Sequence, residues 1–220
     1  MRRSDMEAVI FDYGGVISTP PFDGVAEFEM DQGYPAGSML RLFLGVDDGN
    51  LLDASTASDW HNLETGQLTL AEYLERLVER APSYLGGVPF DIEAYYRFSM
   101  EAPFGVHWMM VHRVRGLRET GYRTAILTNN VAEWRPVWRS TFPVDDLFHA
   151  VVDSSEVGMR KPDPAIYLLT CERLGVDPNR SVFLDDNLAN VQAARSLGMH
   201  SILVGPDPRH ALAELDALGL

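Results

Sequence analysis

Cysteine is scarce in this sequence, and long apolar runs are missing from it. Cys171 is the single cysteine among 220 residues, which excludes an intrachain disulfide and favours a reducing, cytoplasmic location. No apolar run reaches the roughly 18 residues of a membrane span, so we expect no membrane partner. The first residues, Met1–Asp5, include two arginines but precede no apolar stretch of signal-peptide length, so we expect no secretion signal.

Positive charge is also in short supply. The chain has 32 acidic and 18 basic residues, which gives a formal net charge of −14. A surface this acidic repels nucleic acid and anionic lipid, so we exclude both as partners, while the composition leaves the oligomeric state open. Lys161 is the only lysine, and every other basic residue is arginine. Either chance left a lysine there, or position 161 needs a compact ammonium group that a guanidinium group cannot replace.

Short apolar runs alternate with helical segments in most of the chain. Runs of this length are typical of strands that are buried on both faces of a parallel sheet. The helical segments end at Gly121, Gly175 and Gly198, as helices commonly do. This alternation predicts an α/β fold with a Rossmann-like parallel sheet and helices on both faces. The predicted strands are 8–11, 124–127, 150–152, 182–184 and 201–204, and the predicted helices are 107–119, 164–174 and 187–197.

Residues 19–103 differ from the rest because they contain helix signals and no comparable strand run. The clearest signal is the capping box Thr69–Glu72, which predicts a helix through Arg80. The block has 15 acidic residues and 4 arginines, a net charge of −11. We therefore predict an α/β core made of 1–18 and 104–220, with a helical cap, 19–103, inserted after the first strand. Such an insert is well placed to act as a lid over a site at the sheet's edge.

Polar residues follow three of the predicted strands. Asp12, Thr128 and the pair Asp185–Asp186 each come at or directly after a strand end. Taken singly, each has an ordinary explanation as a turn residue or a helix cap. Because the carboxyl ends of parallel strands meet at one edge, together they predict a single site there. A carboxylate would serve as nucleophile or metal ligand, the hydroxyl would bind an oxyanion, and the paired carboxylates would bind Mg²⁺.

Four short motifs contain these strand-end residues and Lys161. They are Asp12–Val16, Leu127–Asn130, Arg160–Pro164 and Phe183–Asn187. In this order, they resemble the motifs of the haloacid dehalogenase-like (HAD) hydrolase superfamily. The resemblance covers essentially the whole chain, and the helical insert is similar to the cap that this family places after its first motif. Within the insert, Trp60–Gly66 resembles the cap of the phosphatase domain fused to soluble epoxide hydrolase, and of the related domain in some acyl-CoA dehydrogenases.

The resemblance implies a Mg²⁺-dependent phosphatase. Asp12 would attack phosphorus and form an aspartyl-phosphate. Mg²⁺ would be bound by Asp12, the backbone carbonyl of Gly14 and Asp186, with Asp185 as a further ligand or as a supporting partner.

The remaining two motifs would bind the phosphate group. Thr128 and the Asn129 amide would hold phosphate oxygens, and Lys161 would neutralise charge on the nucleophile and on the transferring phosphoryl group. The acidic cap would repel a polyanion, so the resemblance and the charge together imply a small phosphorylated substrate.

Gly14 departs from the family pattern, because phosphatases of this family usually have a second aspartate there that protonates the leaving group. A glycine transfers no proton, and losing such a group typically slows a reaction about 10²–10⁴-fold. Three alternatives remain open. Another group or a water molecule supplies the proton, the substrate has a good leaving group, or the chain is a catalytically weak phosphate-binding or regulatory protein.

Other members that lack the second aspartate suggest further alternatives. The 2-haloacid dehalogenases use no metal and usually lack the paired carboxylates, so Asp185–Asp186 argues against their chemistry without excluding it. Phosphonatases form a Schiff base with a cap lysine, whereas the only lysine here belongs to the third motif. Some sugar-1-phosphate phosphatases also lack this aspartate, which keeps the phosphatase as the main hypothesis.

Overall fold

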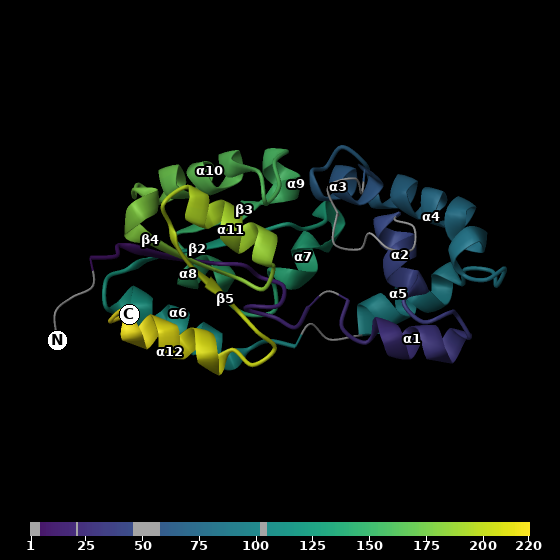
Figure 1. Ribbon diagram of the computed structural model, residues 1–220, viewed down its shortest axis with the longest axis horizontal. Coiled ribbons are helices and arrows are strands. Elements are labelled where there is room, and N and C mark those ends of the chain that lie inside the picture. Colours follow the sequence, from purple (N-terminus) through teal and green to yellow (C-terminus); the bar gives the residue numbers. More distant parts are fainter. Residues whose placement is uncertain (1–4, 21, 46–57, 102–104) are drawn as a thin grey trace. The chain divides into compact units, whose positions relative to one another are not determined.

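The computed structural model describes residues 5–20, 22–45, 58–101 and 105–220, and these form two compact units (Figure 1). The first unit contains the described residues of Met1–Pro21, Phe104–Asn130 and Trp134–Leu220, and the second contains those of Phe22–Pro103 and Val131–Glu133. No helix in these described ranges combines the length and the apolar character needed to cross a membrane.

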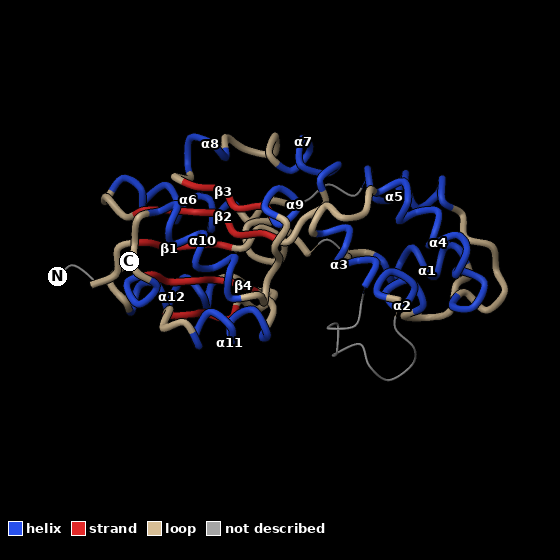
Figure 2. Tube along the Cα trace, turned by 90° about the horizontal axis from the view of Figure 1, so that it is seen from above, coloured by secondary structure: helices blue, strands red, loops and turns tan. Residues whose placement is uncertain are grey.

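A five-stranded sheet forms the centre of the first unit. Its strands are β1 (Ala8–Phe11), β2 (Arg123–Thr128), β3 (Ala150–Asp153), β4 (Ser181–Asp185) and β5 (His200–Leu203). They lie side by side in the order β3-β2-β1-β4-β5 (Figure 2). All neighbouring strands are parallel. The predicted α/β fold with its parallel sheet is therefore confirmed. The central strand is β1, whose last residue pairs with Ile126 on one side and with Leu184 on the other.

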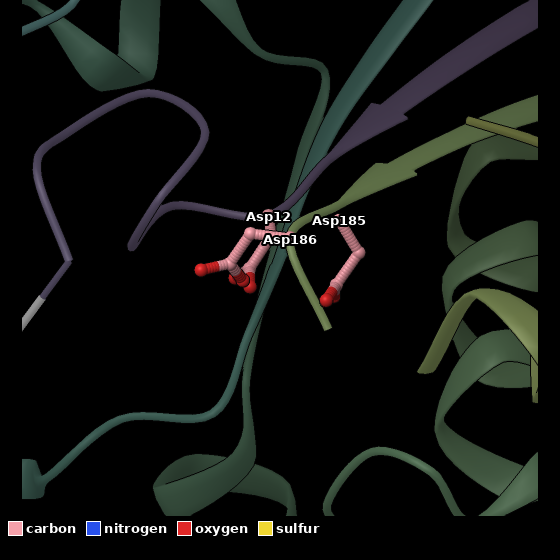
Figure 3. A group of neighbouring side chains, drawn as sticks. All are labelled: Asp12, Asp185 and Asp186. Carbon is pink, nitrogen blue, oxygen red and sulfur yellow. The ribbon is translucent and has the colours of Figure 1, made fainter. Parts of the chain in front are cut away.

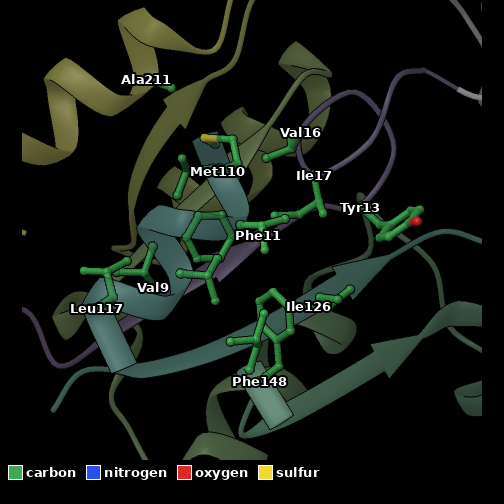
Figure 4. Close-up of a cluster of buried hydrophobic side chains, with 14 of the residues drawn as sticks. Val9, Phe11, Tyr13, Val16, Ile17, Met110, Leu117, Ile126, Phe148 and Ala211 are labelled. Carbon is green, nitrogen blue, oxygen red and sulfur yellow. The ribbon is translucent and has the colours of Figure 1, made fainter. Parts of the chain in front are cut away.

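Both faces of the sheet are covered by helices, because successive apolar side chains of β1 point to opposite faces and both sets are buried. Val9 and Phe11 pack on one face and Ala8 and Ile10 on the other. Side chains of α6 (Trp108–Glu119), α8 (Val144–Leu147) and α12 (Arg209–Ala217) cover the first face, part of which Figure 4 shows. Side chains of α10 (Pro164–Leu174) and α11 (Leu188–Ser196) cover the second. The shorter elements are η2 (Ala132–Trp134), α7 (Arg135–Trp138), α9 (Ser154–Val157) and η3 (Pro178–Arg180).

Two helices begin immediately after loops that carry predicted site residues, and local chemistry fixes both starts. The side chain of Asp163 accepts a hydrogen bond from the Ala165 amide (2.9 Å), with Pro164 in the first turn of α10. The Asn187 side chain accepts one from the Ala189 amide (2.9 Å) at the start of α11. These caps hold the third and fourth motifs at the ends of rigid elements.

The second unit consists of helices in the described part of the chain. They are α1 (Val25–Gln32), α2 (Ser38–Leu44), α3 (Ser58–Glu64), α4 (Leu70–Tyr84) and α5 (Ile92–Glu101). The predicted capping box is present at α4, where Thr69 Oγ1 accepts from the Glu72 amide and Glu72 Oε2 accepts from the Thr69 amide. Trp60 and Tyr73 are buried and in ring contact, at 5.7 Å between centroids, so they form part of this unit's core.

Candidate active site

Three carboxylates meet at the carboxyl ends of the two central strands. Asp12 follows β1 directly, and its amide continues the strand ladder by donating to the Leu184 carbonyl (2.8 Å). Asp185 is the last residue of β4 and Asp186 follows it. One oxygen from each carboxylate lies within 4.8 Å of the others (Figure 3). The side-by-side pairing of β1 and β4, whose motifs lie more than 170 positions apart, thus creates the cluster.

The ammonium group of Lys161 joins this cluster. Its Nζ lies 2.8 Å from Asp12 Oδ2 and 2.6 Å from Asp185 Oδ2, and the side chain is only 1% exposed. A guanidinium group is larger and planar, and it would not fit between two carboxylates in a fully buried position without displacing them. This geometry favours the second explanation for the single lysine, namely that position 161 needs a compact cation.

The site holds more negative than positive charge, and two of its three carboxylates, those of Asp12 and Asp185, are buried. Three carboxylates face one ammonium, a formal surplus of two negative charges. Burial raises the pKa of Asp12 well above its usual value; Lys161 opposes this, and the neighbouring Asp185 and Asp186 add to it. Burial and then the Asp185 charge raise the pKa of Asp186 to about 6. Burial alone would lower the pKa of Lys161, but the two carboxylates outweigh it and raise that pKa.

This donor set fits a magnesium ion. Mg²⁺ prefers oxygen ligands, is typically held by one or two carboxylates plus water and substrate, and would match the surplus of two charges. Asp12 and Asp186 are the better placed ligands. The oxygens of Asp185 already accept hydrogen bonds from Lys161 Nζ, from the Asn187 amide (2.8 Å) and from Asn190 Nδ2 (3.0 Å). These contacts suit Asp185 to holding Lys161 rather than to binding an ion.

The loop after β1, which contains Gly14, brings Gly15 against the Asp186 carboxylate. Tyr13 O accepts hydrogen bonds from the amides of Ile17 and Ser18, which turns the chain tightly after Asp12. Gly15 has φ +73°, and a Cβ atom there would lie 2.1 Å from Asp186 Oδ2. Only glycine allows the Asp186 carboxylate to approach the loop this closely.

The second motif lies at the carboxyl end of β2. Thr128 is the last residue of that strand, pairs with Asp153 of β3, and is 2% exposed. The side chain of Asn129 contacts the backbone of Lys161 in two ways: Oδ1 accepts from its amide (2.8 Å) and Nδ2 donates to its carbonyl (3.0 Å). The structure therefore brings the residues predicted for the site to one edge of the sheet.

Two residues that touch this cluster escaped the sequence analysis. Asn190 donates to both oxygens of Asp185 from the first turns of α11, and Gly15 makes room for Asp186. The signal for Asn190 was its place in the first turn of the helix that follows Asp185–Asp186, because a short polar side chain there lies close to the end of the preceding strand. No local pattern distinguishes Gly15 from an ordinary turn glycine, since the close approach comes from a strand far along the sequence.

Comparison with known proteins adds independent information. The family model described as a haloacid dehalogenase-like hydrolase matches residues 6–198. Acyl-CoA dehydrogenase family member 10 of Mus musculus is 32% identical over 214 residues, which cover 96% of this chain and 19% of that protein. Bifunctional epoxide hydrolase 2 of Sus scrofa is 28% identical, covering 96% and 38%. The chain thus spans well under half of either relative. A phosphoglycolate phosphatase of Nitrosospira multiformis is 31% identical over 153 residues, covering 64% and 67%.

Solved structures share the fold. A HAD family enzyme from Bacteroides thetaiotaomicron, in complex with magnesium and inorganic phosphate, superposes with a TM-score of 0.63 at 21% identity and covers 94% of this chain and 98% of that one. An L-2-haloacid dehalogenase from Xanthobacter autotrophicus, with chloropropionic acid covalently bound, superposes with the same score and identity, covering 95% and 81%. The same fold therefore occurs in proteins with both kinds of ligand.

Proposed function

Because the chain belongs to the haloacid dehalogenase-like hydrolase family, we propose that it is a Mg²⁺-dependent phosphatase of a small cytoplasmic phosphomonoester. The observation that carries the proposal is the Lys161 ammonium, buried between Asp12 and Asp185 beside a third carboxylate. This arrangement leaves a surplus of two negative charges at the sheet's edge. A divalent cation together with a phosphate group is the ligand pair that such a site suits best.

In the proposed reaction, Asp12 is the nucleophile. A carboxylate oxygen of Asp12 forms a bond to phosphorus, the ester P–O bond breaks, and the departing oxygen keeps the bonding electron pair. Water then attacks the aspartyl-phosphate, which releases inorganic phosphate and restores Asp12. The Lys161 ammonium holds the Asp12 carboxylate in place and offsets charge on the phosphoryl group as it transfers.

The other residues bind and orient the substrate. The Thr128 hydroxyl and the backbone amide of Asn129 are proposed to donate hydrogen bonds to phosphate oxygens at the end of β2. Asp12, Asp186 and the backbone carbonyl of Gly14 would hold Mg²⁺, with Asp185 supporting Lys161. When bound, the ion would neutralise phosphate charge and so let a carboxylate approach it. We propose that the acidic helical unit acts as the cap and selects substrates of low negative charge.

Gly14 restricts the substrates that the proposed enzyme would turn over well. No proton donor stands at that position, so the leaving oxygen must depart without one or take a proton from water or another group. Phosphate esters of acidic alcohols, aryl phosphates, acyl phosphates and anomeric sugar phosphates meet this condition. Alkyl phosphates would react slowly for the same reason.

Release of phosphate from para-nitrophenyl phosphate tests the proposal. Nitrophenolate leaves without a proton, so Gly14 does not limit this reaction. We expect release in the presence of Mg²⁺, little release with a chelator, and a fall to background in Asp12→Asn. Asp177→Asn is the matched control, because Asp177 is an exposed aspartate just before β4, at the opposite end of that strand; it should keep full activity.

The same samples distinguish the rival functions. Chloride release from 2-chloropropionate that persists in the chelator would overturn the phosphatase in favour of dehalogenation. If neither phosphate nor chloride is released, while inorganic phosphate still binds in the presence of Mg²⁺, the chain is instead a phosphate-binding protein. Wild-type activity equal to that of Asp12→Asn would exclude Asp12 as the nucleophile.

A further inference from the structure

We propose that the side chain of Asn129 is a positioning residue that fixes the backbone of Lys161 and thereby places its ammonium between Asp12 and Asp185. Its catalytic consequence rests on the proposed function; its structural consequence does not. The observation is a pair of hydrogen bonds from one carboxamide to both backbone groups of one residue, across 32 positions of sequence.

The chemistry of this contact is specific to asparagine. Oδ1 accepts from the Lys161 amide at 2.8 Å while Nδ2 donates to the Lys161 carbonyl at 3.0 Å. A carboxamide offers one acceptor and two donors in a plane, so it pairs with a peptide backbone as a neighbouring strand would. Aspartate retains the acceptor and presents an oxygen to the Lys161 carbonyl. Leucine, of nearly the same shape, offers neither group.

Lys161 needs such a support because of where it lies. It stands in the loop between α9 and α10, outside any helix or strand, and the next residue is a proline, which has no amide proton. Its side chain is long and has four rotatable bonds, yet its ammonium meets two carboxylates at once. If the backbone of Lys161 were not fixed, the two ion pairs alone would have to offset the conformational entropy that is lost when the lysine side chain is ordered.

The carboxamide also connects parts of the site that are distant in sequence. Asn129 follows Thr128, the last residue of β2, and Lys161 contacts Asp12 beyond β1 and Asp185 at the end of β4. The same edge of the sheet therefore fixes the positions of the Lys161 backbone and of both carboxylates. A shift of about 1 Å in the backbone would lengthen one ion pair or the other, and misplacements of that size can slow catalysis about 10²-fold.

The single lysine allows a direct test that does not depend on activity. Protein produced with lysine carrying ¹³C at Cε, and with a lysine-free tag, gives one Cε signal from the chain, that of Lys161. We expect this signal to differ from that of free lysine in the wild type, and to move toward the free-lysine position in Asn129→Leu and Asn129→Asp. Asn179→Leu is the matched control, because Asn179 is exposed in η3 before β4 and should leave the signal unchanged.

Kinetics with para-nitrophenyl phosphate and Mg²⁺ form the second arm. We expect kcat to fall roughly 10- to 100-fold in both Asn129 variants with KM little changed. If Asn129→Leu does not fold, Asn129→Ser provides the same comparison, since its short hydroxyl cannot span both backbone groups.

The outcomes separate the two proposals. Wild-type protein without phosphatase activity would overturn the proposed function, and the lysine signal would still decide the role of Asn129. A folded Asn129 variant whose Lys161 signal superposes on that of the wild type, even with a lowered melting temperature, would overturn the positioning role.

Discussion

Gly15 and Lys161 show how much of this site rests on the size of single residues. Lys161 suits its place because an ammonium group is small enough to sit between two carboxylates while remaining 1% exposed. Gly15 suits its place because the Cβ atom that it lacks would lie only 2.1 Å from Asp186 Oδ2. Both residues therefore have roles that depend on what surrounds them in space, and neither role follows from its chemical type alone.

Replacing Gly15 by alanine tests the second of these roles. The new Cβ would force the Asp186 carboxylate away, so we expect Mg²⁺ affinity, measured by isothermal titration, to fall at least about tenfold, as for other disturbed metal ligands. The positive φ adds a cost of about 1–2 kcal/mol in stability. Gly175→Ala is the control, because Gly175 has φ +66° with nothing within 4 Å of its Cβ position. It should lose similar stability and keep its affinity; equal affinities in the two variants would contradict the role of Gly15.

At the scale of elements, polar side chains fix how helices begin. The caps of α10 and α11 hold two of the site motifs, and the helical unit has a related device in Glu29 of α1. Glu29 is 3% exposed, and its carboxylate accepts hydrogen bonds from the amides of Gly37 and Met39 (both 2.7 Å). These amides lie at the start of α2, where helix amides have no partner within the helix. A side chain of α1 thus provides the hydrogen-bond acceptors for the first amides of α2.

Glu29→Gln should weaken the helical unit. A carboxamide retains one acceptor and turns an N–H toward the other amide, so we expect the free energy of unfolding in urea to fall by about 1.5–3 kcal/mol. Glu27→Gln, two residues earlier on the exposed side of α1, should change stability by less than about 0.5 kcal/mol. Equal stabilities of the two variants would show that the Glu29 carboxylate does not support α2.

For the whole molecule, the balance of charge links the site to stability. The net charge of −14 opposes compaction, and the carboxylate cluster concentrates three of the negative charges at one place, where one lysine only partly offsets them. A cation that binds the folded chain and not the unfolded chain would stabilise it by mass action. The stability of the metal-free protein should therefore depend on pH in a way set by the site.

The direction of that dependence follows from the raised pKa values. With a pKa of about 6 for Asp186 in the folded protein and 3.8 ordinarily, the folded state binds more protons between about pH 4 and 6. The free energy of unfolding should therefore fall as pH rises through that window, and Asp12 acts in the same direction. In the presence of a chelator, the free energy of unfolding of Asp186→Asn should fall by about 1 kcal/mol less over this pH window than that of the wild type. The difference is smaller than the pKa shift of Asp186 implies, because solvent screens the charge of an exposed residue.

Urea unfolding of the metal-free protein at several pH values between 4 and 7 measures this effect, with Asp177→Asn as the control. Addition of Mg²⁺ at pH 7 should raise the stability of the wild type more than that of Asp186→Asn. If the stabilities of the wild type and of Asp186→Asn change by the same amount from pH 4 to 6, in either direction, the raised pKa of Asp186 is contradicted.

The sequence by itself determined the elements and most of the site's membership. Apolar runs gave the five strands. The closing Gly175 and the capping box Thr69–Glu72 gave helix ends, because these signals act over one or two turns of chain. The motif residues were identified for a similar reason, since each follows a strand. Helices α7, α8 and α9 were not predicted, because four residues are too few to show a period.

Only the tertiary structure decided what those residues contact. Pairing of β1 with both β2 and β4 brought Asp12, Lys161 and Asp185 within ion-pair distance. In this arrangement the Asp185 carboxylate accepts hydrogen bonds from Lys161 and Asn190, so it is not equivalent to Asp186 as a metal ligand. It also turned the Asn129 side chain onto the Lys161 backbone. The contacts of Lys161 span 24 to 149 positions of sequence. They depend on strand order and register, which no local run of residues encodes.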